Sequence, residues 1–323
     1  MKRFISCLIL SMAFYSLPAQ TKWTNVDSAY QPLPASLHVY KSTASLDGKP
    51  NIMYYAIADL RDKSLVFTSD TTKNRRLTPS QYFEKNNKPL LVVNCSFFSF
   101  ATNQNLNVVI KDGKLLGYNE QTIAGKGEDT LTYFHSFFGA IGIFKNRKAD
   151  IAWVYSDSAK KYPYASQSPV QFFKDSLQEM DLRYVKNQTT DGRGSPVHFS
   201  KWKVQTAIGG GPVLLQNGEI NISNEEERKF YGKAANNHEP RTAIGYTKDN
   251  KLIVLVAEGR SDTAAGLTLL QQAQIFKDLG CVEALNLDGG GSSCMLINGK
   301  ETNSPSSKGV QRPVPSVFLI KRK

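Results

Sequence analysis

The chain has 323 residues, 41% of them hydrophobic, which is enough for one large domain or two small domains with a substantial core. Its formal net charge is +12, and such an excess of basic residues favours anionic partners. Because the sequence has no block of like charges and no nucleic-acid-binding motif, we interpret this excess as a solvated basic surface.

Residues 1–20 are predicted to be a secretory signal peptide. Lys2 and Arg3 provide its positive start, residues 4–17 are mostly apolar, and residues 18–20 offer a small-residue cleavage region. The apolar run is too short to cross a bilayer comfortably, and no later segment is long and apolar enough for a membrane helix. Removal of the signal would lower the net charge from +12 to +10. We therefore expect a soluble, exported protein that is periplasmic or extracellular.

Three cysteines follow the predicted signal, namely Cys95, Cys281 and Cys294, so at least one thiol is expected to be unpaired. Cys281 is interpreted as a small buried hydrophobic residue. Cys95 and Cys294 each lie in a candidate site motif, and a disulfide between them stays open at this point.

Residues 21–45 are predicted to form an irregular N-terminal extension ahead of one domain that covers residues 46–323. The apolar runs at 52–60 and 65–67 predict the first two strands of this domain.

A short helix is predicted over residues 78–86, with Thr78 as its N-cap. The apolar run 89–93 predicts a buried strand, and the segment 94–100 follows at the strand's end. A polar residue followed by aromatic residues at such a place is typical of a binding site. We interpret Phe97 as a core residue, because Phe is usually buried, and leave Phe98 and Phe100 open between core and sugar platform.

Hairpins are predicted at several places where a polar turn, often Asn-Gly or Asp-Gly, separates two apolar runs, because these dipeptides suit the tight turns that hairpins use. The hairpins are at residues 108–116, 213–220, 244–256 and 295–300. The sequence therefore predicts the α+β class, with a mixed, mainly antiparallel β-sheet body built from hairpins and a few packed helices.

Residues 155–205 are more polar and less periodic than the rest. We interpret them as an insertion or lid over the core, with a helix over residues 168–180, and ordinary surface structure is an equal alternative. The apolar face of residues 267–279 predicts a helix that leads directly into a strand at residues 282–287. The last strand is predicted at residues 314–320.

The most informative stretch runs from Ala284 to Gly299. Its alternation puts Asn286 and Asp288 at the end of a buried strand, and three glycines follow at 289–291. Consecutive glycines lose much backbone entropy on folding, so a functional reason is expected. We favour close approach of backbone N–H groups to an anion, with a plain hairpin turn as the alternative.

Five stretches set polar groups beside glycines or at strand ends, and strand ends from distant parts of a chain can meet at one rim of a fold. They are residues 94–98, 207–214, 240–245, 257–260 and the loop at Gly289. The Gly209 loop is expected to solve a close-packing problem rather than to bind phosphate. The four histidines, His38, His135, His198 and His238, lack metal-ligand spacing, and the pair Ser292-Ser293 lacks the pattern of a nucleophilic serine.

These motifs resemble those of the phosphodiester glycosidase family, in the family's order from about Asn51 to the C-terminus. The resemblance lies in Asn94-Cys95-Ser96-Phe97-Phe98, Gly209-Gly210-Gly211-Pro212-Val213-Leu214, Arg241-Thr242-Ala243-Ile244-Gly245, Glu258-Gly259-Arg260, Asn286-Leu287-Asp288-Gly289-Gly290-Gly291-Ser292-Ser293, and Asn303-Ser304-Pro305 with Arg312. The chain departs from the family at Cys95 and Ser96, where glycines are usual, and at Glu258, where Asp is frequent.

The resemblance implies an enzyme that cleaves a sugar–phosphate diester at the anomeric carbon and releases a sugar and a phosphomonoester. Glycosidases commonly use two carboxylates, for which Asp288 and Glu258 are the candidates here. Because a phosphomonoester is a good leaving group, electrostatic stabilisation of the phosphate should matter more than acid catalysis. Arg241 is the candidate clamp, since a guanidinium fork matches phosphate oxygens.

Further substrate contacts are expected from residues next to these three. Asn94 and Asn286 are candidates to orient sugar hydroxyls or the attacking water. For Arg260 and Arg312, contact with the ligand and an ion pair at the surface are balanced alternatives. Gly289, Gly290, Gly291 and Ser292 are candidate N–H and hydroxyl donors. Alternatively, Arg241 pairs with Glu239, and Glu258 only holds an arginine. No cofactor is predicted, and a structural ion such as calcium has no recognisable ligands.

Two other functions fit the same residues. A non-catalytic envelope protein that binds anionic polysaccharide would account for the basic charge and for Cys95 and Ser96. A metal-dependent phosphodiesterase would instead cut on the phosphate side. The main hypothesis requires that the carboxyl of Asp288 and the guanidinium of Arg241 face the same hollow.

Overall fold

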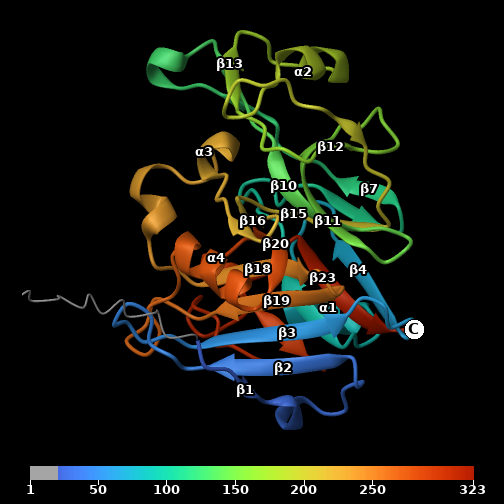
Figure 1. Cartoon of the computed structure of the whole chain (residues 1–323), viewed down its shortest axis with the longest axis vertical. Helices are drawn as coiled ribbons and strands as arrows, with labels where there is room; N and C mark the ends of the chain where they lie inside the picture. The colour runs from blue at the N-terminus through green and yellow to red at the C-terminus, as the bar shows by residue number, and fades with distance from the viewer. Residues whose placement is uncertain (1–20) are drawn as a thin grey trace, which may run out of the picture.

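The computed structural model describes residues 21–323, so the predicted signal peptide at 1–20 lies outside the described residues. Within this range the chain forms four β-sheets in which all strand pairs are antiparallel (Figure 1). The mainly antiparallel α+β body predicted from the hairpins is therefore confirmed.

The largest sheet has eight strands and carries both the Arg241 and the Asp288 motifs. Its order is β1 (Thr24–Asn25), β2 (Leu37–Ser42), β3 (Met53–Asp59), β19 (Lys251–Ala257), β18 (Arg241–Thr247), β20 (Cys281–Asn286), β16 (Val213–Gln216) and β17 (Glu219–Ile220). The long apolar runs of β18, β19 and β20 are buried on both faces, which explains why they lack an alternating pattern.

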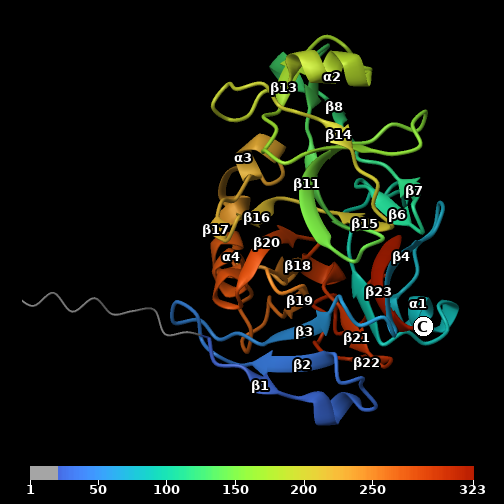
Figure 2. The same ribbon diagram turned by 45° about the vertical axis from the view of Figure 1, so that its right-hand side comes forward.

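A seven-stranded sheet and a three-stranded sheet form the other end of the molecule. The former has the order β14 (Ser200–Lys201), β12 (Tyr164–Ser166), β11 (Ala149–Tyr155), β10 (Phe138–Ile143), β15 (Thr206–Gly209), β6 (Val109–Lys111) and β7 (Lys114–Gly117). The latter comprises β13 (Phe173–Asp175), β9 (Tyr133–His135) and β8 (Thr122–Ala124). Both views place β13 and helix α2 (Leu182–Gln188) at the end of the molecule opposite to β1 and β2 (Figures 1 and 2).

The five-stranded sheet holds the C-terminal strand in its interior. Its order is β22 (Lys300–Glu301), β21 (Met295–Ile297), β5 (Leu91–Asn94), β23 (Ser316–Arg322) and β4 (Leu65–Thr71). Helix α1 (Pro79–Lys85) packs beside it and starts with the predicted Thr78 cap, which forms a capping box with Gln81. Strand β5 ends at Asn94, so the first site motif lies at the C-terminal end of this interior strand.

Helix α4 (Leu269–Asp278) packs on the eight-stranded sheet against β16 and β20. Thr268 caps its N-terminus, and its buried face, which includes Ala273 and Phe276, fills the space above the strands. The remaining short helices are α3 (Asn224–Glu227) and the 3-10 turns η1 (Asp27–Tyr30), η2 (Gly127–Asp129), η3 (Gly232–Asn236) and η4 (Gly290–Ser292). The packing of α4 holds β20, and with it the start of the glycine loop, in a fixed place.

The structure corrects two predicted elements. The extension at 21–45, expected to be irregular, contains strand β2, which pairs with β3 because Leu37 and Val39 bury alternate side chains in the core. The helix expected over 168–180 is absent from the described chain: residues 173–175 instead form β13, whose partner β9 lies far away in sequence.

Three further expectations can be compared with the described residues. Cys95, Cys281 and Cys294 are all buried free thiols, so the bridge between Cys95 and Cys294 is not formed. Within residues 21–323, no group of three or more His, Cys, Asp or Glu side chains is placed to hold a metal ion. None of the helices in this range has the length and hydropathy needed to cross a bilayer.

Candidate active site

A hollow of about 400 Å³ lies where several strand ends meet. Asp288 and the loop after β20 form one side, the first residue of β18 and the segment before it form another, and the segments after β5, after β19 and before β23 complete it. We call this cavity the hollow; its lining residues are Phe97, Phe100, Phe230, Ala234, Asn237, Glu239, Arg241, Arg260, Asp288, Gly289, Gly290, Gly291 and Arg312. Asp288 and Arg241, distant in sequence, thus face one cavity.

Asp288 is held by its main chain and leaves part of its carboxyl group free. Its N–H donates to the carbonyl of Cys95 (2.8 Å), and its own carbonyl accepts from Asn94 Nδ2 (2.5 Å). The atom Oδ2 is buried and has no hydrogen-bond partner within the described part of the chain. Burial raises the pKa of Asp288 to about 6, although the Ser292 hydroxyl and the charge of Arg312 oppose this. A carboxyl of this kind is suited to exchanging a proton near neutral pH.

Arg241 is a buried cation that main-chain carbonyls hold in place. Only 3% of the residue is exposed, and its guanidinium donates to the carbonyls of Leu267 (3.0 Å) and Asn237 (3.1 Å). Among residues 21–323 no ion pair joins Arg241 to a carboxylate, since Glu239 pairs with Arg260 instead (2.7 Å). Burial lowers the pKa of Arg241 to about 10, which still leaves it charged at neutral pH. Its charge is therefore available to an anion in the hollow.

The glycine loop makes room for two guanidinium groups. A Cβ atom on Gly291 would lie 2.1 Å from Arg312 Nη2, and one on Gly290 would lie 3.1 Å from Arg260 Nη2. The N–H of Gly290 donates to the carbonyl of Pro240 (2.7 Å), so it is not free for a ligand. The loop was expected to present its N–H groups to an anion, but its clearest effect in the structure is to admit arginines beside Asp288.

Asn94 lies behind the hollow and not on its surface. Its side chain is fully buried, and Oδ1 accepts from Thr242 Oγ1 (3.0 Å) and from the N–H of Cys294 (3.1 Å). With Nδ2 bound to the carbonyl of Asp288, this one amide ties β5, β18 and the glycine loop together. Asn94 is thus placed to fix the position of Asp288.

Asn286 is also fully buried and outside the lining of the hollow. Its Nδ2 donates to the carbonyl of Gly211 (2.8 Å), whose N–H in turn donates to the carbonyl of Asn286 (2.8 Å). A Cβ atom on Gly210 would lie 2.3 Å from that same carbonyl. The Gly209 loop therefore allows close packing of two backbones, as expected from the sequence.

Glu258, the expected partner of Asp288, does not line the hollow. It is half-buried, and Oε1 accepts from the N–H of Ser304 (2.9 Å). Burial raises the pKa of Glu258, and the nearby charge of Lys41 opposes this. The second carboxylate in the hollow is Glu239, which is already paired with Arg260. The structure therefore does not bring together the two carboxylates that the sequence suggested.

The three phenylalanines after β5 have different positions. Phe97, expected in the core, is half-buried and lines the hollow, whereas Phe98 is a buried member of the core beside α1. Phe100 is 62% exposed, and the guanidinium groups of Arg76 (5.2 Å) and Arg312 (5.5 Å) lie over its ring. The loop turns Phe97 and Phe100 toward the hollow, which leaves Phe98 for the core.

Lys229 is a cation beside the hollow that the sequence did not reveal. Its ammonium lies 3.7 Å from the centroid of the Phe97 ring and 4.3 Å from that of Phe138. Burial lowers the pKa of Lys229 to about 8, and the negative charges of Glu227 and Asp288 act against this. The ammonium and the Asp288 carboxyl are thus close enough to affect each other's protonation.

Glu227 anchors the segment that carries Lys229. Its fully buried carboxylate accepts hydrogen bonds from Ser223 Oγ (2.6 Å), Val213 N (2.9 Å), Gly139 N (3.0 Å) and Trp153 Nε1 (3.1 Å). In the sequence, three consecutive glutamates followed by Arg and Lys are typical of a solvated turn, so no local signal marks Glu227 as buried.

The family model described as phosphodiester glycosidase matches residues 139–321, more than half of the chain. N-acetylglucosamine-1-phosphodiester alpha-N-acetylglucosaminidase is 33% identical over 101 residues in Mus musculus and 32% identical in Homo sapiens, in each case over 29% of this chain and 19% of the relative. A prophage-derived uncharacterized protein of Bacillus subtilis is 38% identical over 81 residues, 25% of this chain and 12% of that protein. The matches thus span less than a fifth of these relatives.

Solved structures share the fold over most of the chain. The zebrafish N-acetylglucosamine-1-phosphodiester alpha-N-acetylglucosaminidase catalytic domain, auto-inhibited by its pro-peptide, superposes with a TM-score of 0.58 at 23% identity, covering 94% of this chain and 89% of that one. A hypothetical protein from Synechocystis superposes with a TM-score of 0.59 at 15% identity, covering 89% and 62%.

Proposed function

The chain belongs to the phosphodiester glycosidase family, and from this premise we propose that it hydrolyses sugar-1-phosphodiester linkages in glycans or surface polymers. The products are a free sugar and a phosphomonoester. We further propose that the protein is exported, with residues 1–20 removed as its signal; N-terminal sequencing of the mature protein tests this part separately.

The observation that carries the proposal is the charge distribution in the hollow. The cavity is lined by three arginines, Arg241, Arg260 and Arg312, and within residues 21–323 only Arg260 is paired with a carboxylate. A phosphodiester brings the negative charge that this set lacks. Asp288 lines the same cavity, and its buried Oδ2 has no hydrogen-bond partner among residues 21–323, so the anion site and a proton acceptor are adjacent.

In the proposed reaction, a water molecule attacks the anomeric carbon while the bond from that carbon to the phosphate oxygen breaks. Asp288 accepts the proton of the attacking water, for which a pKa of about 6 is suitable. The phosphate leaves with the electron pair of the broken bond, and it needs little protonation because its second pKa is about 6. Arg241 and Arg312 stabilise the charge that gathers on it.

The remaining predicted residues receive supporting roles. Asn94 is a positioning residue because it bonds the carbonyl of Asp288. Asn286 holds the backbone of Gly211 behind the loop. Phe97 and Phe100 provide apolar walls for a sugar ring. Glu258 holds the backbone of Ser304 and does not touch the substrate.

Product analysis on a panel of aryl sugar-1-phosphodiesters tests the proposal. We expect a free sugar and an aryl phosphate from the wild type, and loss of both in Asp288→Asn. Release of a sugar 1-phosphate would indicate cleavage on the phosphate side, as in the phosphodiesterase alternative. Tight binding of anionic glycans without turnover of any diester would instead support the non-catalytic alternative.

A further inference from the structure

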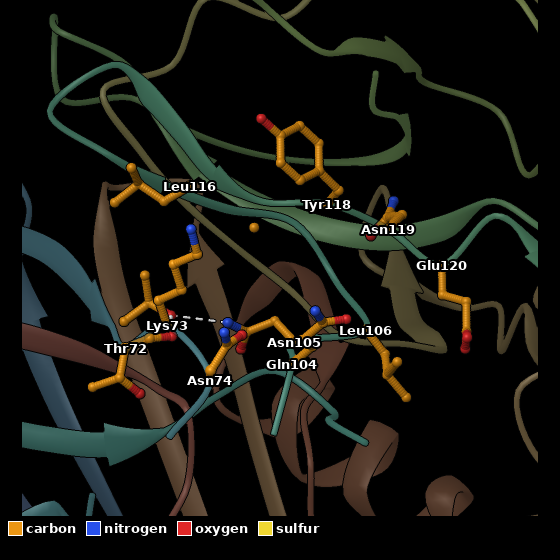
Figure 3. Close-up of a pocket in the computed structure, with 12 residues that line it drawn as sticks. Thr72, Lys73, Asn74, Gln104, Asn105, Leu106, Leu116, Tyr118, Asn119 and Glu120 are labelled. Carbon is orange, nitrogen blue, oxygen red and sulfur yellow. Dashed lines mark hydrogen bonds between the residues drawn. The ribbon is translucent and has the colours of Figure 1, made fainter. Parts of the chain in front are cut away.

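A second cavity, which we call the cleft, lies beside β7 and has a volume of about 760 Å³. This volume is within the range of about 300–1,000 Å³ that small-molecule sites occupy. Figure 3 shows that Lys73, Asn74 and Gln104 face Leu116 and Tyr118 across it. The other lining residues are Thr71, Thr72, Asn105, Leu106, Gly117, Asn119 and Glu120.

The floor of the cleft is fixed by its own hydrogen bonds. Asn105 donates to Thr71 Oγ1 (2.9 Å) and accepts from Ser316 Oγ (2.6 Å). Asn119 donates to the carbonyl of Val154 (2.8 Å) and accepts from a main-chain N–H. These amides hold in place the three segments that line the cleft, residues 71–74, 104–106 and 116–120. The shape of the cleft therefore does not depend on a ligand.

The rim of the cleft, in contrast, carries polar side chains with unused hydrogen-bonding capacity. Within residues 21–323, no side-chain hydrogen bond or ion pair is formed by Lys73, Asn74, Gln104, Tyr118 or Glu120. Tyr118 is 39% exposed, and Leu116 beside it is 45% exposed. The rim therefore combines amide and hydroxyl groups with an apolar surface.

This combination matches an uncharged sugar chain. A pyranose ring has an apolar face of C–H groups, which suits the Tyr118 ring and Leu116, and an edge of hydroxyls, which suits Asn74 and Gln104. The cleft has one cation and one anion, whereas three guanidinium groups line the hollow. We propose that the cleft is a second carbohydrate-binding site that takes a neutral oligosaccharide.

The cleft and the hollow share one wall. The loop after β5 turns Phe97 to the hollow and Leu106 to the cleft, and the N–H of Leu106 donates to the carbonyl of Phe97 (2.8 Å). Glu120 in turn donates its N–H to the carbonyl of Leu106 (2.9 Å). The sugar in the cleft is therefore a neutral part of the same polymer whose phosphodiester enters the hollow, a placement that rests on the proposed function.

The test is calorimetric titration of the mature protein with three neutral probes, namely cellotetraose, chitotetraose and maltotetraose. We expect at least one to bind, and the double variant Gln104→Ala/Tyr118→Ala to weaken it at least ten-fold. Both side chains are exposed and unbonded, so their removal should not disturb folding. Lys114→Ala, an exposed residue of strand β7 that lies outside the cleft although Leu116 and Gly117 of this strand line it, is the matched control and should bind like wild type.

Failure of this proposal can be distinguished from failure of the proposed function. Asp288→Asn should bind the tetrasaccharide like wild type while it loses diester cleavage. If the wild type binds the tetrasaccharide but cleaves no diester, and the double variant no longer binds the tetrasaccharide, the enzyme proposal is wrong and the cleft proposal stands. The cleft proposal is overturned if no tetrasaccharide binds at millimolar concentration, if binding survives the double variant, or if only a neutral Ser- and Gly-rich peptide binds.

Discussion

Two buried carboxyl groups beside Lys229 differ in how they are satisfied. The carboxylate of Glu227 accepts four hydrogen bonds from four different segments, whereas Oδ2 of Asp288 accepts none within the described chain. A saturated buried carboxylate holds a structure together, because every lone pair is committed. An unsaturated one adds less to the packing but can still bind a water molecule or a proton. The contrast separates an anchoring carboxylate from a reacting one, although the charges of both act on Lys229.

Replacing Asp288 by Asn should have the largest effect and tests the reacting side of this contrast. The variant keeps the shape of the side chain but has no base, so turnover of a sugar-1-phosphodiester should fall by roughly 10²–10⁴-fold. Steady-state kinetics measures this, with Glu258→Gln as the matched carboxyl outside the hollow. An equal loss in Glu258→Gln would restore the two-carboxylate mechanism and contradict our assignment.

The same variant should not be less stable than wild type at pH 8. The pKa of Asp288 is raised in the folded state, so its contribution to stability is present at pH 4 and is lost as the pH rises through about 6. Asn has no such charge to bury. The thermal midpoint of Asp288→Asn relative to wild type should therefore be higher at pH 8 than at pH 4.

Replacing Arg241 by Lys tests whether the hollow needs a guanidinium or only a positive charge. Lys cannot bond the carbonyls of Leu267 and Asn237 and still present a fork to phosphate. Loss of a charged hydrogen bond costs about 1.5–3 kcal/mol, which corresponds to roughly a ten- to hundred-fold fall in kcat/KM. If the fall is in kcat/KM for diesters but binding of the free sugar is unchanged, the phosphate contact is supported; unchanged kcat/KM would contradict it.

Replacing Glu227 by Gln tests the anchoring side. One oxygen becomes an NH₂ group that must face a donor such as the N–H of Gly139 or the indole of Trp153. An unsatisfied buried donor costs about 1–3 kcal/mol in the free energy of unfolding, which urea denaturation measures. A stability equal to that of wild type would show that the four hydrogen bonds do not carry this region.

Replacing Lys229 by Met should have the smallest effect and connects the two regions. The positive charge of Lys229 lowers the pKa of Asp288, so its removal should raise that pKa. Because Asp288 must be ionised to act as a base, the acid limb of the kcat/KM profile, near pH 6 in wild type, should move to higher pH. Lys300→Met, outside the hollow, is the control and should leave the acid limb in place. If the acid limb does not move in Lys229→Met either, the charge of Lys229 does not affect the pKa of Asp288.

The elements that the sequence predicts well are those with strong local signals. Thr78 and Gly289 to Gly291 illustrate this, because a capping box and a glycine run are recognisable without knowing their neighbours. Asp288 and Arg241 were found from motifs at strand ends, and the antiparallel sheet brings these ends together.

The residues that the sequence did not reveal depend on distant partners. Glu227 lies in a run of charged residues that indicates solvent exposure, and only its contacts with Gly139, Val213 and Trp153 explain its burial. The segment 173–175 likewise forms a strand because β9, far away in the chain, provides its partner. Glu258 was chosen for its motif, but the direction of its side chain is set by Ser304, which the sequence does not place beside it.

The contact between Gly291 and Arg312 has an evolutionary consequence. A side chain at position 291 would occupy the space of the guanidinium, so the Arg312 side chain would have to move away from its place in the hollow. Relatives that gain a larger residue at 291 should have a shorter residue at 312, and a chain that keeps one partner alone should lose the arginine from beside the aspartate. Covariation of these positions in an alignment of the family would therefore record the geometry of this corner of the hollow.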